Sequence, residues 1–169
     1  MDNQEVIKNK KGLFIVFEGL DRSGKSTQSS KLFEHFQKEL NLPAQKLNFP
    51  DRNGKTGKLL SDYLKNSEEM SDEAVHLLFA MNRWEKYSQL KSQLCQEGIN
   101  LICDRYAYSG VAYTAAKGLD FNWCLNADRG LIEPDIIFYI DIDKDTIQNR
   151  AGFGDERYEK ADFQEKVRE

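Results

Sequence analysis

The chain has 169 residues, of which 40% are hydrophobic and 31% charged, with a net charge of -4 at pH 7. These values are ordinary for a globular protein, and the length suits one α/β domain with a substantial core. Proteins that bind the backbone of DNA or RNA are usually basic, so the acidic balance argues against a polymeric nucleic-acid partner.

The cysteines and the short apolar runs indicate where in the cell the protein is located. Cys95, Cys103 and Cys124 form no CxxC pair and no spacing typical of a metal site. Three thiols fit a reducing environment better than a disulfide framework. Residues 1–11 form a polar extension without the apolar stretch of a signal peptide, and no apolar run is long enough to span a bilayer. We expect a cytoplasmic protein with no membrane partner.

Four apolar runs predict β-strands. Residues 13–19, 101–104 and 135–142 form continuous runs, typical of strands buried on both faces of a parallel sheet. Residues 44–50 are a weaker candidate, which Pro50 would help to end.

Helical patterns lie between these runs. The first helix should begin within Gly24-Lys25-Ser26-Thr27, the second should span about 56–65, and the third about 72–96. Shorter helices should follow positions 105, 120 and 162. The first helix carries its apolar residues on one face, namely Leu32, Phe33, Phe36 and Leu40. Strands alternating with helices predict an α/β fold with a doubly wound parallel sheet, in a single domain over residues 1–169.

The third predicted helix is apolar on two sides. Ser71 should cap its start and Gly98 should stop it. One face carries a long stripe, Leu77, Met81, Trp84, Tyr87, Leu90 and Leu94, and the other carries Val75, Phe79 and Arg83. Such a helix must bury one side against the core and the other against a pocket or a partner.

A phosphate-binding loop follows the first predicted strand. Residues 19–26, Gly-Leu-Asp-Arg-Ser-Gly-Lys-Ser, match GxxxxGK[ST] at every position. Backbone N–H groups of such a loop and the next helix bind phosphate, Lys25 reaches the β- and γ-phosphates, and Ser26 can ligate Mg²⁺. Arg22 could stabilise transition-state charge in cis, or lie at the outer edge of the loop. No NKxD element is present, which weakens a GTPase interpretation.

Charged residues also follow two other predicted strands. In parallel sheets ligands bind at the carboxyl ends of strands, which directs attention to residues 49–52 and to Asp104-Arg105. Asp104 occupies the place of a Walker-B-type carboxylate near Mg²⁺. A planar guanidinium such as that of Arg52 suits two-point phosphate binding. Structural salt bridges at strand ends are the alternative.

The longer motifs resemble those of thymidylate kinases. FEGLDRSGKST, FPDR, LLFAMNRWE, DRYAYSGVAYTAAKG and RAGFGDERYEKADFQ look like segments of that family and occur in its order. The arginine in the phosphate loop is similar to the eukaryotic and poxvirus branch. The resemblance implies a P-loop fold, Mg²⁺ as cofactor, and ATP and dTMP as substrates.

Family positions imply roles for individual residues. The phosphates of ATP would contact Gly19, Asp21, Arg22, Ser23, Gly24, Lys25, Ser26 and Thr27. Arg105 would bind phosphate between donor and acceptor, and Arg52 would hold the phosphate of dTMP. Phe49 would line the pocket, Phe79 would stack on thymine and Arg83 would bind a base carbonyl, although Phe49 and Phe79 also suit a plain core. Asp21 would accept from the 3′-hydroxyl, and Tyr113, which shares a short helix with Ser109 and Gly110, would close the 2′ position.

The tail and the assembly complete what the resemblance implies. Residues 150–159 look like a lid with Gly152 and Gly154 as hinge positions, Arg150 near adenine and Tyr158 near dTMP. Family members continue beyond the position of Glu169 with a further strand and helix, so that part of the fold would be missing here. The family also implies a homodimer, for which the third helix is a candidate interface. A kinase for another nucleoside monophosphate or a deoxynucleoside, or a non-catalytic nucleotide-binding module, are the remaining alternatives.

Overall fold

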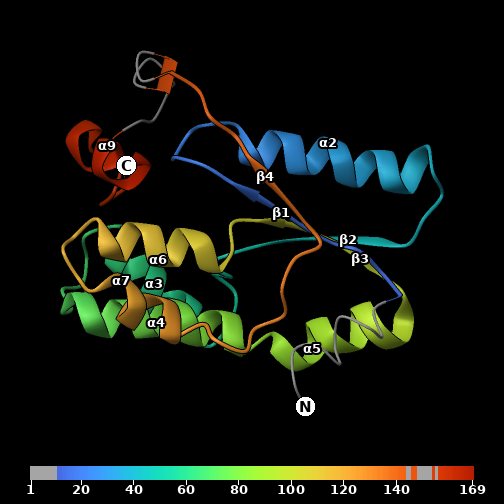
Figure 1. The fold of residues 1–169 in the computed structure, drawn as a ribbon, viewed down its shortest axis with the longest axis horizontal. Helices are drawn as coiled ribbons and strands as arrows, with labels where there is room; N and C mark the ends of the chain where they lie inside the picture. Colours follow the sequence, from blue (N-terminus) through green and yellow to red (C-terminus); the bar gives the residue numbers. More distant parts are fainter. Residues whose placement is uncertain (1–10, 144–145, 148–153, 155) are drawn as a thin grey trace.

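The computed structural model describes residues 11–143, 146–147, 154 and 156–169, and is built around a parallel sheet (Figure 1). Its strands are β1 (Phe14–Glu18), β2 (Ala44–Asn48), β3 (Asn100–Asp104) and β4 (Ile136–Tyr139). They follow the order β2-β3-β1-β4, and every neighbouring pair is parallel. All four predicted strands and the parallel α/β class are therefore confirmed.

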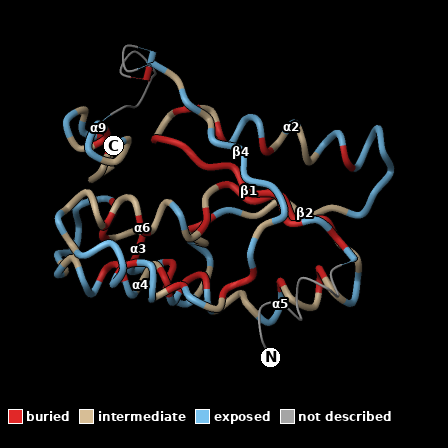
Figure 2. Tube along the Cα trace, in the orientation of Figure 1, coloured by how far each residue is buried: buried red, intermediate tan, exposed pale blue. Residues whose placement is uncertain are grey.

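The core is formed by alternate residues of β1 and β3. In the register, Phe14 lies opposite Leu101 and Ile15 opposite Ile102. Phe14 and Leu101 pack with Leu90 and Leu94 on one face of the sheet. Ile15 and Ile102 pack on the other face, together with Leu32, Phe33 and Phe36 of the first helix. Because successive side chains of a strand point to opposite faces, a continuous apolar run requires helices on both sides. Figure 2 shows the resulting burial along β1.

Strand β4 departs from the prediction that it is buried on both faces. Its residues are exposed, from 40% at Ile136 to 56% at Tyr139. It lies at the edge of the sheet and, among the described strands, pairs only with β1. The apolar run identified the strand correctly but did not identify its place in the sheet.

The predicted helices form with small shifts at their ends. They are α2 (Lys25–Lys38), α3 (Gly57–Leu64), α6 (Ala107–Ala115), α7 (Phe121–Asn126) and α9 (Ala161–Arg168). Leu40 lies beyond the end of α2 and is 47% exposed, so it does not belong to the buried face that its spacing suggested. Within the described part of the chain, no helix is long and apolar enough to cross a membrane.

The predicted long helix is divided into three. Its parts are α4 (Asp72–Trp84), α5 (Tyr87–Ser92) and a π-helical segment η1 (Gln93–Glu97). Ser71 does cap the start by accepting from the backbone N–H of Ala74, and Gly98, with φ of 69°, ends the last part. At the break, Lys86 forms an ion pair of 2.7 Å with Asp51, and Glu85 accepts from Thr56. The helix thus breaks where Glu85 and Lys86 contact the segment that follows β2, and the sequence has no glycine or proline at this point.

The two parts of this segment have different surroundings. Leu90 and Leu94 are buried against the sheet, whereas Leu77 and Met81 are 50% and 52% exposed. Helices α3, α4, α6 and α7 lie together beyond the carboxyl ends of β1 and β3, and α9 lies near α6 (Figure 1). The predicted stripe is therefore a core face in α5 and η1 and an exposed face in α4.

Candidate active site

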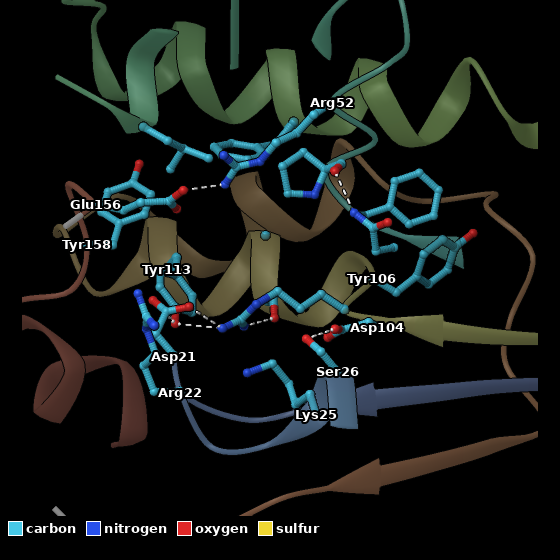
Figure 3. A pocket seen from close by; sticks show the side chains of 18 of the residues that line it. Asp21, Arg22, Lys25, Ser26, Arg52, Asp104, Tyr106, Tyr113, Glu156 and Tyr158 are labelled. Carbon is cyan, nitrogen blue, oxygen red and sulfur yellow. Dashed lines mark hydrogen bonds and ion pairs between the residues drawn. The ribbon is translucent and has the colours of Figure 1, made fainter. Parts of the chain in front are cut away.

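A cavity of about 670 Å³ opens between the sheet and this group of helices. Its wall includes most of the residues predicted from the sequence: Asp21, Arg22, Gly24, Lys25, Ser26, Thr27, Phe49, Arg52, Phe79, Arg83, Asp104, Arg105, Ser109, Gly110, Tyr113 and Tyr158. Figure 3 shows side chains from the phosphate loop, the ends of β2 and β3, and the tail pointing toward one space. The structure brings together segments that are more than 100 residues apart in the sequence.

The phosphate loop is shaped by its glycines. Gly19 has φ of 142°, and a Cβ there would lie 2.4 Å from the carbonyl oxygen of Ile140, so no other residue fits without rearrangement. Gly24 has φ of 106° and starts α2, whose N-terminus therefore faces the cavity. Gly19 and Ser23 support the loop rather than line the cavity; Ser23 is 3% exposed.

Lys25 is buried at the base of the loop. Its ammonium group donates to the carbonyl of Leu20 and, at 3.3 Å, to the hydroxyl of Ser23. Burial, aided by the charge of Arg105, lowers the pKa of Lys25 to about 7 despite nearby carboxylates. An anionic ligand would favour the protonated form, so the site is ready to stabilise negative charge.

Ser26, in the first turn of α2, meets Asp104 at the carboxyl end of β3. The hydroxyl of Ser26 donates to a carboxylate oxygen of Asp104, and both residues line the cavity (Figure 3). A hydroxyl and a carboxylate are oxygen donors that Mg²⁺ accepts when phosphates and water supply the other ligands. Among the described residues, no three His, Cys, Asp or Glu side chains gather as a metal site, so a cage made of protein alone is not offered.

Arg105 is the centre of a polar network. It donates to the carbonyl of Gly19 at 2.9 Å, to the hydroxyl of Ser109 at 2.8 Å and to Asp21 at 2.6 Å. Tyr113 donates to the other oxygen of Asp21 at 2.9 Å. Asp21 and Tyr113 are 92 positions apart in the sequence, yet their side chains lie together (Figure 3).

The network sets the charges of its members. Burial opposes ionisation of Asp21, but the charges of Arg105 and Lys25 and hydrogen bonds from Tyr113 and Gln164 outweigh it, so the pKa of Asp21 lies below its ordinary value. Burial raises the pKa of Tyr113 above its ordinary value. Asp21 is therefore an anion and Tyr113 a neutral hydroxyl at physiological pH.

Two other arginines are engaged by carboxylates of the tail. Arg22 forms an ion pair of 2.8 Å with Glu159, and Arg52 forms one of 2.5 Å with Glu156. Both arginines line the cavity. Carboxylates and phosphates bind the guanidinium fork in the same way, so each glutamate occupies a place suited to a phosphate oxygen.

The loop that carries Arg52 is fixed by α4. The side-chain amide of Asn82, a 1% exposed residue, accepts from the backbone N–H of Asp51 at 2.7 Å and donates to its carbonyl at 3.0 Å. The same amide donates to Thr56 at 2.7 Å. Because α4 also carries Phe79 and Arg83, one helix positions both the loop with Arg52 and these two cavity-lining side chains.

The far end of the cavity is partly apolar. Phe49 is 4% exposed and packs 5.6 Å from the ring of Tyr106, so it belongs to the core and to the cavity wall at once. Phe79 packs against the cluster of Leu60, Tyr63, Leu64 and Val75 while also lining the cavity. Arg83 is 2% exposed, and Asp128 holds it in an ion pair.

The tail closes one side of the site. Tyr158 lines the cavity and shares a hydrogen bond of 3.1 Å with the hydroxyl of Tyr63. Arg157 donates to the carbonyl of Tyr63 and pairs with Glu69. Of the predicted lid, Arg150 and Gly152 lie outside the described residues. Of the predicted N-terminal extension, only Lys11 is described.

Several residues of the site were not predicted from the sequence. They are Glu18, Asp128, Glu156, Glu159 and Gln164. Glu18 is 6% exposed and accepts from the backbone N–H of Tyr106 at 2.9 Å and from Ser109, so it fixes the start of α6. A lone carboxylate inside an apolar strand run was the signal for it. The side-chain amide of Gln164 accepts from the backbone N–H of Asp21 and donates to its carboxylate, contacts that only the tertiary structure reveals.

Comparison with known proteins agrees with this geometry. The family model described as thymidylate kinase matches residues 17–169. A thymidylate kinase of Plasmodium falciparum is 52% identical over 95% of this chain and 76% of its own length, and one of Dictyostelium discoideum is 48% identical over 95% and 72%. The solved structure of a thymidylate kinase from Candida albicans superposes with a TM-score of 0.83 at 42% identity, covering 93% of this chain and 75% of that one. A family model over most of the chain, and relatives at this identity and coverage, establish that the chain belongs to the thymidylate kinase family.

Proposed function

We propose that the chain catalyses the reaction of its family, the transfer of the γ-phosphoryl group of ATP to dTMP, giving ADP and dTDP. The observation that carries this proposal is a single cavity with a phosphate loop at one end and Arg52, Phe79 and Arg83 at the other. One end suits a triphosphate, and the other suits the phosphate and base of a monophosphate. Membership of the family favours this reaction over a different acceptor or a non-catalytic module.

The chemistry needs positioning and charge neutralisation more than a strong base. The attacking phosphate oxygen of dTMP is already anionic, so no group has to remove a proton from it. Phosphoryl transfer spreads negative charge over the transferred group, and fixed cations stabilise that charge. Lys25 and Arg22 would act on the donor side, and Arg105 would bridge donor and acceptor.

Mg²⁺ is part of the proposal. Ser26 and Asp104 would hold it, Ser26 directly and Asp104 through water. The cation would neutralise charge on the phosphates of ATP. The Ser26–Asp104 hydrogen bond supports this assignment because it brings the two oxygen donors together at the mouth of the phosphate loop.

The acceptor would be held by its phosphate, its base and its sugar. Arg52 would exchange Glu156 for the phosphate of dTMP, Phe79 would stack on the base, and Arg83 would donate to a base carbonyl. Asp21 would accept from the 3′-hydroxyl, which requires it to share an oxygen now bonded to Tyr113, Arg105 or Gln164. Tyr113, at the sugar position, would leave no room for a 2′-hydroxyl.

Formation of ADP with a panel of acceptors tests the function. The panel contains dTMP, dUMP, dGMP, dCMP, AMP and thymidine, each with Mg·ATP. We expect the highest kcat/KM with dTMP. Preference for another acceptor would overturn the assignment of the base end while leaving that of the phosphate loop. Binding of ATP without turnover of any acceptor would favour a non-catalytic module.

We also propose that the chain forms homodimers through α4. Leu77, Met81 and Trp84 recur at helical spacing, and they are 50%, 52% and 37% exposed. A row of large apolar side chains on one helix face is typical of an interface. A cytoplasmic location is proposed as well, supported by three cysteines that form no disulfide, and fractionation of cells that express the protein tests it.

A further inference from the structure

Asp128 lies behind the base end of the cavity and holds Arg83 at two points. The Nε of Arg83 donates to one carboxylate oxygen at 2.8 Å, and Nη2 donates to the other at 2.6 Å. The two side chains are 2% and 3% exposed. A buried two-point ion pair fixes the plane of the guanidinium as well as its position.

Gly110 confines the same guanidinium from the cavity side. A Cβ added at Gly110 would lie 2.8 Å from Nη2 and 3.0 Å from Nη1 of Arg83. Gly110 itself lines the cavity. Asp128 occupies the Nε–Nη2 edge, and Nη1 lies beside Gly110, where the cavity wall has no side chain.

The backbone around Asp128 is anchored to α4 independently of this ion pair. Trp84, next to Arg83, donates from its indole to the carbonyl of Ala127 at 2.9 Å. The ring of Trp84 also lies 3.3 Å from the position that a Cβ of Gly130 would occupy. The carboxylate thus has a fixed base from which to hold Arg83.

We propose that Asp128 is a positioning residue that sets the nucleobase preference of the site by holding the Arg83 guanidinium. This inference rests on the proposed function for the identity of the acceptor. The guanidinium offers only N–H donors. When it is held in one plane, it can donate to a carbonyl of the base but has no acceptor for an amino group at the same place. Loss of Asp128 would release this constraint without touching the phosphate loop.

A pair of acceptors that differ at the base edge tests the inference. dTMP and 5-methyl-dCMP share the sugar, phosphate and methyl group, but a carbonyl in the first is an amino group in the second. We expect Asp128→Asn to lower the ratio of their kcat/KM values by roughly tenfold or more, mainly through a higher KM for dTMP. Its kcat with dTMP should change much less, because the phosphate ends are untouched.

The matched control is Asp120→Ala, which removes a helix cap. Asp120 is another carboxylate of the same region, and it caps α7 by accepting from the backbone N–H of Trp123 at 2.7 Å. This variant should lower the melting temperature and keep the wild-type ratio. A merely structural role for Asp128 would give the same pattern in Asp128→Asn, with a lower melting temperature and an unchanged ratio, and would overturn the inference.

Two further variants keep the test decisive. Asp128→Glu retains the charge opposite Arg83 but lengthens the side chain by one methylene, so it should fold and still lower the ratio. In an Arg83→Gln background, Asp128→Asn should leave the ratio unchanged, because Asp128 acts through Arg83. A wild-type ratio in Asp128→Glu, or a further fall in the double variant, would overturn the inference. A wild-type enzyme without preference for dTMP would instead overturn the proposed function.

Discussion

At the scale of single residues, the site depends on arginines whose backbone is unusual. Arg22 and Arg105 have φ of 62° and 66°, in the left-handed region that non-glycine residues seldom occupy. Such strain occurs mainly where the surrounding structure imposes it, often at functional sites. Here the backbone N–H of Arg105 donates to the carbonyl of Phe17 at 2.9 Å, which holds the turn that directs the side chain to Asp21.

Arg22→Ala should lower kcat by about a thousandfold while changing the affinity for dTMP little. The reason is that an arginine beside the transferred group stabilises charge that develops only in the transition state. Steady-state kinetics together with calorimetric titration of dTMP measure the two effects separately. If turnover and affinity fell by the same factor, or if neither changed, the assignment of Arg22 as a transition-state group would be wrong.

Gly110→Ala should raise the KM for dTMP by about tenfold, the scale of one lost charged hydrogen bond. The new methyl group would overlap the guanidinium of Arg83, which cannot retreat because Asp128 holds it. Gly118→Ala is the control, since a Cβ there meets nothing within 4 Å although φ is 102°. That variant should lose about 1 kcal/mol of stability and keep its KM. Equal KM changes in both variants would contradict the argument.

At the scale of elements, the pattern of apolar residues predicted that a strand or helix forms better than it predicted what that element packs against. The run at 135–142 and the helical stripe from Leu77 to Leu94 gave a strand and helices in the right places. Apolar side chains alone could not show that β4 lies at an edge, or that only the second half of the stripe faces the sheet. Likewise the ion pair that joins Arg83 to Asp128 spans 45 positions, and no local pattern announces it. Motif spacing identified the residues that face the cavity. The residues that hold them in place, such as Asp128, could be identified only from tertiary contacts.

His76 joins three helices and makes their packing depend on pH. It is fully buried in α4, with one ring nitrogen 2.9 Å from the carbonyl of Cys124 and the other 2.8 Å from the hydroxyl of Thr114. The carbonyl can only accept, so the neutral ring donates to Cys124 and accepts from Thr114. Burial, which outweighs the charge of Asp128, lowers the pKa of His76 below 6.5.

Its effect on stability follows from that direction. The unfolded chain binds a proton at His76 near pH 6.5, whereas the folded chain binds it only at a lower pH, so stability is full above pH 6.5 and falls as the pH drops toward the folded pKa. His76→Gln can keep both hydrogen bonds and has no proton to bind. Its melting temperature should therefore fall less between pH 7 and about pH 5. His35→Gln, on the exposed side of α2, should keep the wild-type slope, and an equal slope in His76→Gln would refute the argument.

In the proposed function, Glu156 of the tail would compete with the phosphate of dTMP for Arg52. Glu156 holds Arg52 at 2.5 Å, but the side chains are 32% and 39% exposed, so the ion pair contributes at most about 1 kcal/mol. Glu156→Gln should therefore lower the KM for dTMP by about fivefold or less, with a smaller effect at high salt. Kinetics at two ionic strengths measure it, with Arg52→Ala as the contrasting variant whose KM should rise strongly. A higher KM in Glu156→Gln would mean that Glu156 assists binding.

At the scale of the whole molecule, the cavity and the exposed face of α4 are two sides of one helix. Its inner side carries Phe79, Asn82 and Arg83, and its outer side carries Leu77, Met81 and Trp84. The loop with Arg52 and the segment with Asp128 are both attached to it. A partner packed on the outer side would therefore rest against the element that positions the side chains proposed to bind the base and phosphate of the acceptor.

Leu77→Glu should convert the protein from a dimer to a monomer. Leu77 is 50% exposed, and a charge buried at an interface without a partner costs more than a small interface can offset. Leu59 of α3 is 48% exposed and lies outside the proposed interface, so Leu59→Glu is a matched control that should remain dimeric. Light scattering after gel filtration gives the masses. A monomeric wild type would contradict the proposed dimer. A dimeric Leu77→Glu variant would mean that the interface lies elsewhere. If the dimer is lost and the KM for dTMP rises with it, the outer side of α4 contributes to acceptor binding through assembly.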